Sequence, residues 1–137
     1  MQARVKWCGE LTFLGTSGSG HSVVMDGNQG QHAPSPMEMV LMSVASCSSV
    51  DVVSILQKAR QNISDCTVEV QAKRADAVPA VFESIHLHFI VQGSDVSDNH
   101  VERAVRLSAD KYCSVSIMLG ASVEITHSYS VEPTPAS

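Results

Sequence analysis

The sequence has few aromatic residues and a long stretch without positive charge. Only 4% of its 137 residues are aromatic, and residues 7–57 contain neither lysine nor arginine. The formal net charge is -5, which argues against nucleic acid and against anionic membrane surfaces as partners. We therefore expect no nucleic acid and no membrane among the partners of this chain.

Two kinds of hydrophobic segment are also missing. No apolar run follows a basic segment near the N-terminus, so we expect no secretion signal and a location in the reducing cytoplasm. The uncharged stretch between Glu38 and Asp51 has 12 residues, whereas a membrane-spanning helix needs about 20. In the cytoplasm, four cysteines are expected to be free, metal-bound or catalytic rather than paired in a disulfide framework.

The segment 36–60 predicts one long helix. Pro36 suits a first helical position, Ser35 can cap the helix, and Glu38 places a negative charge in the first turn. Apolar residues occur on every face between Glu38 and Asp51, which predicts burial all round. One small sheet cannot cover such a helix completely. We therefore expect the long helices of two chains to pack together in a two-fold homodimer.

Alternating apolar and polar residues predict extended strands before and after this helix. The predicted strands lie in residues 2–14, 21–26, 66–75, 81–92 and 121–131. Gly9 predicts a turn within the first of these segments, and the glycine-rich segment 15–20 predicts a hairpin turn. Residues 132–137 are expected to fray. The expected fold is α+β, with antiparallel sheets around a long buried central helix, in a single domain over residues 1–137.

A second helix is predicted from residue 98 or 99 through Tyr112, with Cys113 at its end. Residues 114–119 then predict a new helical turn that Gly120 closes. Cys113 would lie at the N-terminus of that turn. The helix dipole and the free N–H groups there favour a thiolate, so Cys113 is a candidate reactive cysteine.

The remaining candidate groups have simpler interpretations. Cys47 lies near the middle of the long helix, where a small buried core residue is the ordinary expectation. Cys8 and Cys66 fall on predicted strands and are interpreted as packing residues. His86 and His88 alternate onto the outer face of a strand, but no third ligand accompanies them, so we expect a solvated surface and no metal site.

Two cysteine motifs together resemble the OsmC/Ohr family, and in particular its small YhfA-like branch. They are P-x-E-M-V-L followed by A-S-C within residues 36–47, and C-S-V-S-I-M-L at residues 113–119. The resemblance covers nearly the whole chain, including the order of strands and helices. It implies an intertwined homodimer with active sites at the subunit interface and thiol-dependent reduction of peroxides, especially organic hydroperoxides. By the same resemblance, Cys47 is the attacking cysteine and Cys113 closes the disulfide.

The implied chemistry needs no cofactor, and the sequence contains no cofactor motif. A thiolate attacks the peroxide O–O bond and becomes a sulfenic acid, which a second thiol converts to a disulfide. An intracellular dithiol then restores the two thiols. The attacking cysteine must form a thiolate readily, and the two Cα atoms must lie within about 7 Å for the disulfide to close.

The sequence departs from the pattern of the family's peroxidases, which pair the cysteine with a glutamate ten residues upstream and with an N-terminal arginine. Met37 occupies that upstream position. Glu38 lies nine residues before Cys47, about half a turn around the helix and about 13 Å along its axis. Arg4 is the only arginine in the first 59 residues. Asp51 follows Cys47 by four residues, on the same helix face, where a carboxylate disfavours a thiolate.

Two functions therefore remain open. The first is a thiol-dependent hydroperoxide reductase that uses Cys47 and Cys113, with Glu38, Asp51 and Arg4 as candidate auxiliary residues and with weak or lost activity expected from the departures. The alternative is a non-enzymatic redox-sensing protein, or a protein that binds a small apolar ligand, on the same fold. The enzyme is preferred because both cysteines keep the expected helical settings.

Overall fold

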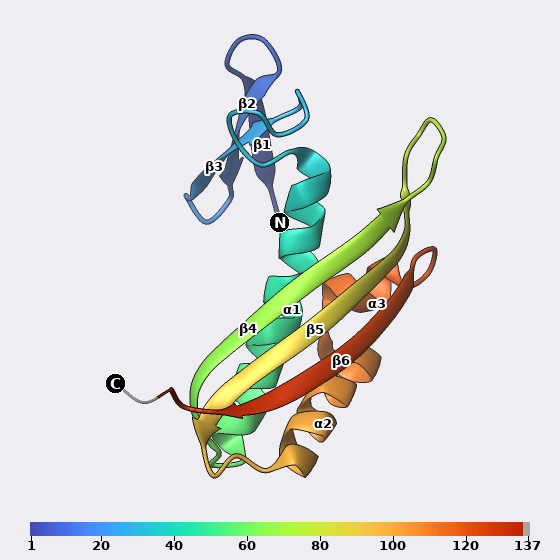
Figure 1. The fold of residues 1–137 in the computed structure, drawn as a ribbon. Helices are drawn as coiled ribbons and strands as arrows, with labels where there is room; N and C mark the ends of the chain where they lie inside the picture. Colours follow the sequence, from blue (N-terminus) through green and yellow to red (C-terminus); the bar gives the residue numbers. More distant parts are fainter. Residues whose placement is uncertain (136–137) are drawn as a thin grey trace. The chain divides into compact units, whose positions relative to one another are not determined.

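The computed structural model describes residues 1–135, and the chain divides into two compact units (Figure 1). The first is Met1–Met42, and the second begins at Ser43. The N-terminal unit contains an antiparallel sheet of three strands in the order β1-β2-β3. Its strands are β1 (Ala3–Trp7), β2 (Thr12–Ser17) and β3 (Ser22–Asp26). The predicted turns are confirmed. Gly9 and Gly20 both adopt positive φ in them, a conformation that glycine reaches without steric cost.

The loop after β3 is organised by one buried carboxylate, Asp26, which is 1% exposed. Its two oxygens accept hydrogen bonds from the backbone N–H groups of Asn28 (2.8 Å) and His32 (2.9 Å). These bonds favour the charged form and hold the pKa of Asp26 below its usual value. The loop therefore has a defined path from the sheet to the long helix.

The long helix is α1 (Pro36–Lys58), which begins where the sequence predicts and ends two residues earlier. Ser35 and Glu38 form a capping box: the Ser35 hydroxyl accepts from the Glu38 N–H (3.2 Å), and the Glu38 carboxylate accepts from the Ser35 N–H (2.9 Å). Arg60 adopts a left-handed conformation (φ 59°) just beyond the helix, which turns the chain away.

In the single chain this helix is only partly buried, and burial all round stays a prediction that requires the expected second chain. Only one i, i+4 stripe is buried, formed by Val44, Ser48, Val52 and Leu56. Val50, on another face, remains 68% exposed. The reason is geometric, because the neighbouring elements of one chain contact one stripe of the helix and leave its other faces uncovered.

By length and composition alone, α1 is also apolar enough to cross a membrane. The core helix of a soluble protein meets the same criterion. The stripe Val44–Ser48–Val52–Leu56 packs inside the protein itself, and one helix of this kind is weak evidence for a membrane span.

The C-terminal unit contains a second three-stranded sheet in the order β4-β5-β6, with helices on one face (Figure 1). Its elements are β4 (Asn62–Arg74), β5 (Phe82–Ser94), α2 (Asp98–Leu107), the π-helix η1 (Ser108–Tyr112), α3 (Ser114–Leu119) and β6 (Glu124–Pro133). Every second residue of β5 is fully buried under the helices: Ile85, Leu87, Phe89 and Val91. The mixed α+β class is confirmed.

The expectation of purely antiparallel sheets is wrong for one strand. β4 and β5 form the predicted antiparallel hairpin, but β6 runs parallel to β5. A parallel partner requires a crossover connection, and the three helical segments between β5 and β6 provide it. β6 also continues past the predicted end at residue 131 to Pro133, and the Thr134 N–H donates to the Gly93 carbonyl (3.3 Å). Residues 136–137 of the expected frayed tail lie outside the described residues.

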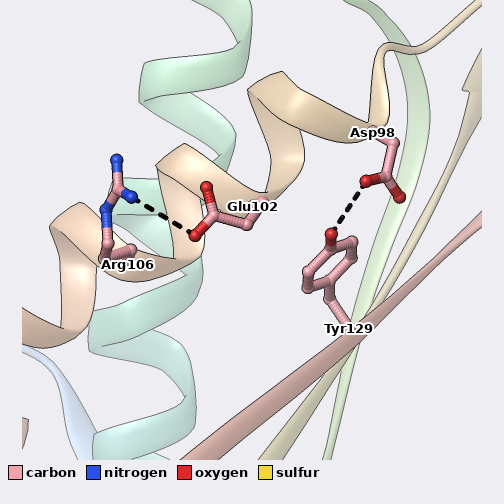
Figure 2. Close-up of polar contacts among 4 residues, drawn as sticks. All are labelled: Asp98, Glu102, Arg106 and Tyr129. Atoms are coloured by element: carbon pink, nitrogen blue, oxygen red, sulfur yellow. Dashed lines mark hydrogen bonds and ion pairs between the residues drawn. The ribbon is translucent and has the colours of Figure 1, made fainter.

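The crossover helix α2 is tied to β6 at its N-terminus (Figure 2). The Tyr129 hydroxyl of β6 donates to the Asp98 carboxylate at 2.9 Å. One helical turn further, Glu102 and Arg106 form an exposed i, i+4 ion pair at 3.4 Å, which contributes little because water screens it. The predicted single helix through Tyr112 is instead α2 followed by the π-helix η1.

Candidate active site

The structure brings Cys47 and Cys113 close together although they lie 66 positions apart in the sequence. Cys47 lies in the middle of α1 and is half-buried, whereas Cys113 is fully buried. The two thiols are close enough that Cys47 raises the pKa of the Cys113 thiol. Both cysteines are free in this structure. Two neighbouring thiols can form a disulfide once either of them is oxidised.

Cys113 caps the N-terminus of α3, as predicted from the sequence. Its sulfur accepts a hydrogen bond from the Ser116 N–H (3.3 Å) and another from the Ser48 hydroxyl (3.2 Å). The inference that this position favours a thiolate is nevertheless wrong for the reduced protein. Burial raises the pKa of the Cys113 thiol, and this effect outweighs the lowering by the Ser48 and Ser116 donors. The neighbouring Cys47 raises it further.

The π-helix η1 delivers Cys113 to this position. The Cys113 N–H donates to the carbonyl of Ser108, five residues earlier, at 2.8 Å. This i to i−5 bond is the pattern of a π turn, which is rare and frequently marks functional sites. The sequence analysis missed it, because nothing in the side-chain pattern of SADKY distinguishes a π turn from an α turn.

Asp51 contacts the π-helix. Its Oδ2 accepts a hydrogen bond from the Ser108 hydroxyl at 3.0 Å, and that hydroxyl also lies 3.4 Å from the Ser48 carbonyl oxygen. Ser108 is 1% exposed. The Asp51 carboxylate therefore connects α1 to the segment that leads to Cys113.

Ser48 and Ser108 are two residues of this site that sequence reasoning missed. A signal for Ser48 exists in the sequence, since it is the only polar residue on the buried stripe Val44–Ser48–Val52–Leu56. A buried hydroxyl needs a hydrogen-bond partner, which predicts a polar contact at this point. The partner could not be named without the tertiary structure.

The two other candidate auxiliary residues lie in the N-terminal unit. The Glu38 carboxylate is part of the capping box described above. Arg4 lies on β1, where it lines a surface cavity of about 400 Å³ together with Lys6 and Thr16. Their contribution to catalysis stays a prediction.

The interpretations of the other two cysteines have different outcomes. Cys66 is half-buried on β4, and burial raises the pKa of its thiol, as fits a packing residue. Cys8 lies one residue beyond β1 and is exposed, so its interpretation as a packing residue on a strand is wrong. Its thiol donates to the Lys6 carbonyl at 3.5 Å.

His86 and His88 share the outer face of β5 as predicted. His86 is hydrogen-bonded to Thr126 (2.7 Å) and Ser128 (2.8 Å), and His88 is hydrogen-bonded to the same Ser128 hydroxyl (2.6 Å). Over residues 1–135, no group of three or more His, Cys, Asp or Glu side chains is arranged to hold a metal ion.

Comparison with known proteins identifies close relatives of this chain. A family model described as OsmC-like protein matches residues 27–128. The chain is 60% identical over 131 residues to protein YhfA of Escherichia coli K12, an alignment that covers 96% of this chain and 98% of YhfA.

Solved structures share the fold over nearly the whole chain. A protein from Aquifex aeolicus VF5 is 31% identical, with a TM-score of 0.88 over 98% of this chain and 97% of that one. Organic hydroperoxide resistance proteins are more distant. OsmC of Legionella pneumophila has 16% identity and a TM-score of 0.70, with 94% of this chain and 95% of that chain covered. OhrB of Bacillus subtilis has 17% identity and a TM-score of 0.63, with 95% and 98% covered. At these identities the likeness is one of fold.

Proposed function

Since the chain belongs to the OsmC-like family, we propose that it reduces organic hydroperoxides with Cys47 and Cys113. The observation that supports this most directly is the proximity of the two cysteines: the Ser48 hydroxyl, directly after Cys47 on α1, donates to the Cys113 sulfur at 3.2 Å. Structural neighbours that are organic hydroperoxide resistance proteins favour the same chemistry. The reaction requires two thiols, a hydroperoxide and an external dithiol, and no cofactor.

The different exposure of the two cysteines supports a different role for each of them. Cys47 is half-buried and can meet a substrate, whereas Cys113 is 0% exposed. In the first step, the Cys47 thiolate attacks the outer peroxide oxygen, the O–O bond breaks, and the alkoxide takes a proton to leave as an alcohol. Cys47 is then a sulfenic acid.

The second step closes the disulfide. The Cys113 thiolate attacks the Cys47 sulfur, the S–S bond forms, and the sulfenic oxygen leaves as hydroxide and becomes water. The raised pKa of Cys113 keeps it protonated before Cys47 is oxidised, so Cys113 is the resolving and not the attacking thiol. An intracellular dithiol then reduces the disulfide by thiol exchange, which is consistent with a cytoplasmic location.

The active protein is proposed to be a homodimer. Val50 and Val53 lie along a shallow, mainly apolar groove of about 610 Å³ on α1, and Val50 is 68% exposed. A second copy of the same helix would cover this face, which no element of the single chain covers in the described residues. Light scattering tests this: the wild type is expected at twice the chain mass and Val50→Glu at the chain mass. A wild-type monomer would refute it.

The decisive experiment measures turnover of cumene hydroperoxide with a dithiol reductant. The wild type is expected to turn over, Cys47→Ser to lose activity, and Cys113→Ser to react once and then overoxidise. The double variant Cys8→Ser/Cys66→Ser is the control and keeps wild-type rates. Equal rates for the wild type and Cys47→Ser would refute the proposal.

A redox-sensing protein on the same fold is the second candidate. Two features favour it: Met37 stands where the family's peroxidases have their glutamate, and the carboxylate of the adjacent Glu38 is engaged in the helix cap. In the same assay this candidate predicts one Cys47–Cys113 disulfide per chain, seen by peptide mapping, without continued turnover by the dithiol.

A further inference from the structure

We propose that Ser48 is a positioning residue that controls how fast Cys113 resolves oxidised Cys47. The inference rests on the proposed two-cysteine chemistry and adds a role for a side chain that neither cysteine motif includes. It concerns the choice between disulfide closure and overoxidation, which decides whether the protein survives each turnover.

The geometry places Ser48 between the two segments that must react. It follows Cys47 directly on α1 and is 1% exposed. Its hydroxyl donates to the Cys113 sulfur at 3.2 Å, and its carbonyl oxygen lies 3.4 Å from the Ser108 hydroxyl at the start of the π-helix. Ser48 therefore contacts the segment Ser108–Tyr112 at its beginning and Cys113 directly after it.

The chemistry of resolution explains why a donor is needed at this point. Cys113 attacks as a thiolate, and burial opposes the formation of that charge. Two donors offset this burial, the Ser48 hydroxyl and the Ser116 N–H. The N–H belongs to the backbone of α3, so Ser48 provides the one side-chain hydroxyl that is hydrogen-bonded to the Cys113 sulfur in residues 1–135.

Loss of the hydroxyl changes one of two competing reactions. The sulfenic acid of Cys47 either loses hydroxide to the attacking Cys113 thiolate, or is oxidised by a second hydroperoxide to a sulfinic acid while that peroxide becomes an alcohol. Ser48 contacts Cys113, so Ser48→Ala slows the first reaction and leaves the second unchanged. A hydrogen bond typically contributes about 1 kcal/mol, so we expect resolution to slow about fivefold.

The matched control is Ser49→Ala. This neighbouring hydroxyl donates to the Ala45 carbonyl within its own helix, at 2.7 Å. Both variants, and the wild type, are treated with increasing cumene hydroperoxide without reductant. Intact-mass analysis then separates chains that lost two hydrogens, the disulfide, from chains that gained two oxygens, the sulfinic acid. Circular dichroism confirms that each variant is folded.

We expect Ser48→Ala to form sulfinic acid at about one fifth of the hydroperoxide concentration that the wild type needs, and Ser49→Ala to behave as the wild type. Equal partition in all three proteins would overturn the role of Ser48. Absence of any oxidation in the wild type would instead refute the proposed function.

A second measurement needs no peroxide. In a chain whose other cysteines are replaced (Cys8→Ser, Cys47→Ser, Cys66→Ser), the ultraviolet absorbance of the thiolate reports the ionisation of Cys113 alone. Adding Ser48→Ala is expected to move that titration to higher pH, because the donor that lowers the pKa of Cys113 is lost. An unchanged titration would overturn the proposal even if the hydroperoxide reaction occurs.

Discussion

The hydrogen bond between Asp51 and Ser108 is expected to fix the π-helix to α1. It is 3.0 Å long, Ser108 is 1% exposed, and hydrogen bonds to charged groups contribute about 1.5–3 kcal/mol. Asp51 is half-buried, so partial solvation places the value at the lower end, about 1.5 kcal/mol. A double-mutant cycle isolates this pair from the other effects of each substitution.

The cycle consists of the wild type, Asp51→Ala, Ser108→Ala and the double variant, each unfolded in urea at one fixed protein concentration. We expect the losses in free energy of unfolding of the two single variants, added together, to exceed the loss in the double variant by about 1.5 kcal/mol. The control cycle is Glu102→Ala with Arg106→Ala, the exposed pair, which should couple by about 0.3–0.5 kcal/mol. If the losses in free energy of unfolding at Asp51 and Ser108 were additive, the hydrogen bond would not hold the π-helix against α1.

Three further outcomes follow from buried groups. The pKa of Asp26 is lowered from its ordinary value of 3.8, so its charged form stabilises the folded protein above that pH, and this stabilisation is lost as the pH falls further. The urea midpoint of Asp26→Asn should lie below that of the wild type at neutral pH, and the difference should shrink in acid. A constant difference would contradict this. Burial lowers the pKa of His127, whose Nε2 is buried without a hydrogen-bond partner among the described residues. The unfolded chain therefore binds a proton at this histidine at higher pH than the folded protein does, and stability falls as the pH drops below about 6.5. His127→Gln should flatten that part of the plot of urea midpoint against pH, and an unchanged slope would count against this. Leu56→Ala, at a position that is 0% exposed, should lower the free energy of unfolding by about 2–5 kcal/mol. Val81→Ala, at a half-exposed position, should lower it by less than about 0.5 kcal/mol. Equal losses would be inconsistent with the buried stripe of α1.

The elements of this fold could be predicted from the sequence because their signals are local. Ser35, Pro36 and Glu38 define the start of α1 through a capping box that spans four residues. The strand β5 alternates strictly, and Gly120 closes α3 where predicted. Cys113 likewise caps α3 through a contact with Ser116, three residues away. Each of these features depends on neighbours within one or two turns of chain.

The direction of β6 and the π turn before Cys113 could not be predicted in this way. The alternation of β6 is the same whether it runs parallel or antiparallel to β5, and only the path of the crossover helices decides between the two. The π turn begins at Ser108, whose hydroxyl donates to Asp51 on another helix, a contact that the local sequence does not indicate. The pKa of Cys113 could not be predicted either, because burial by residues distant in the sequence raises it more than the hydrogen-bond donors lower it.

The sequence by itself determined the order of the helices and strands and supplied two cysteines in helical settings. Local hydrogen bonds and side-chain alternation suffice for that, since they act between residues close in the chain. Only the tertiary structure decided that the two cysteines come close together, that Ser48 donates to the Cys113 sulfur, and that burial raises the pKa of Cys113. These contacts and this burial involve residues that are distant in the sequence, and they form only once α1, η1 and α3 have packed together.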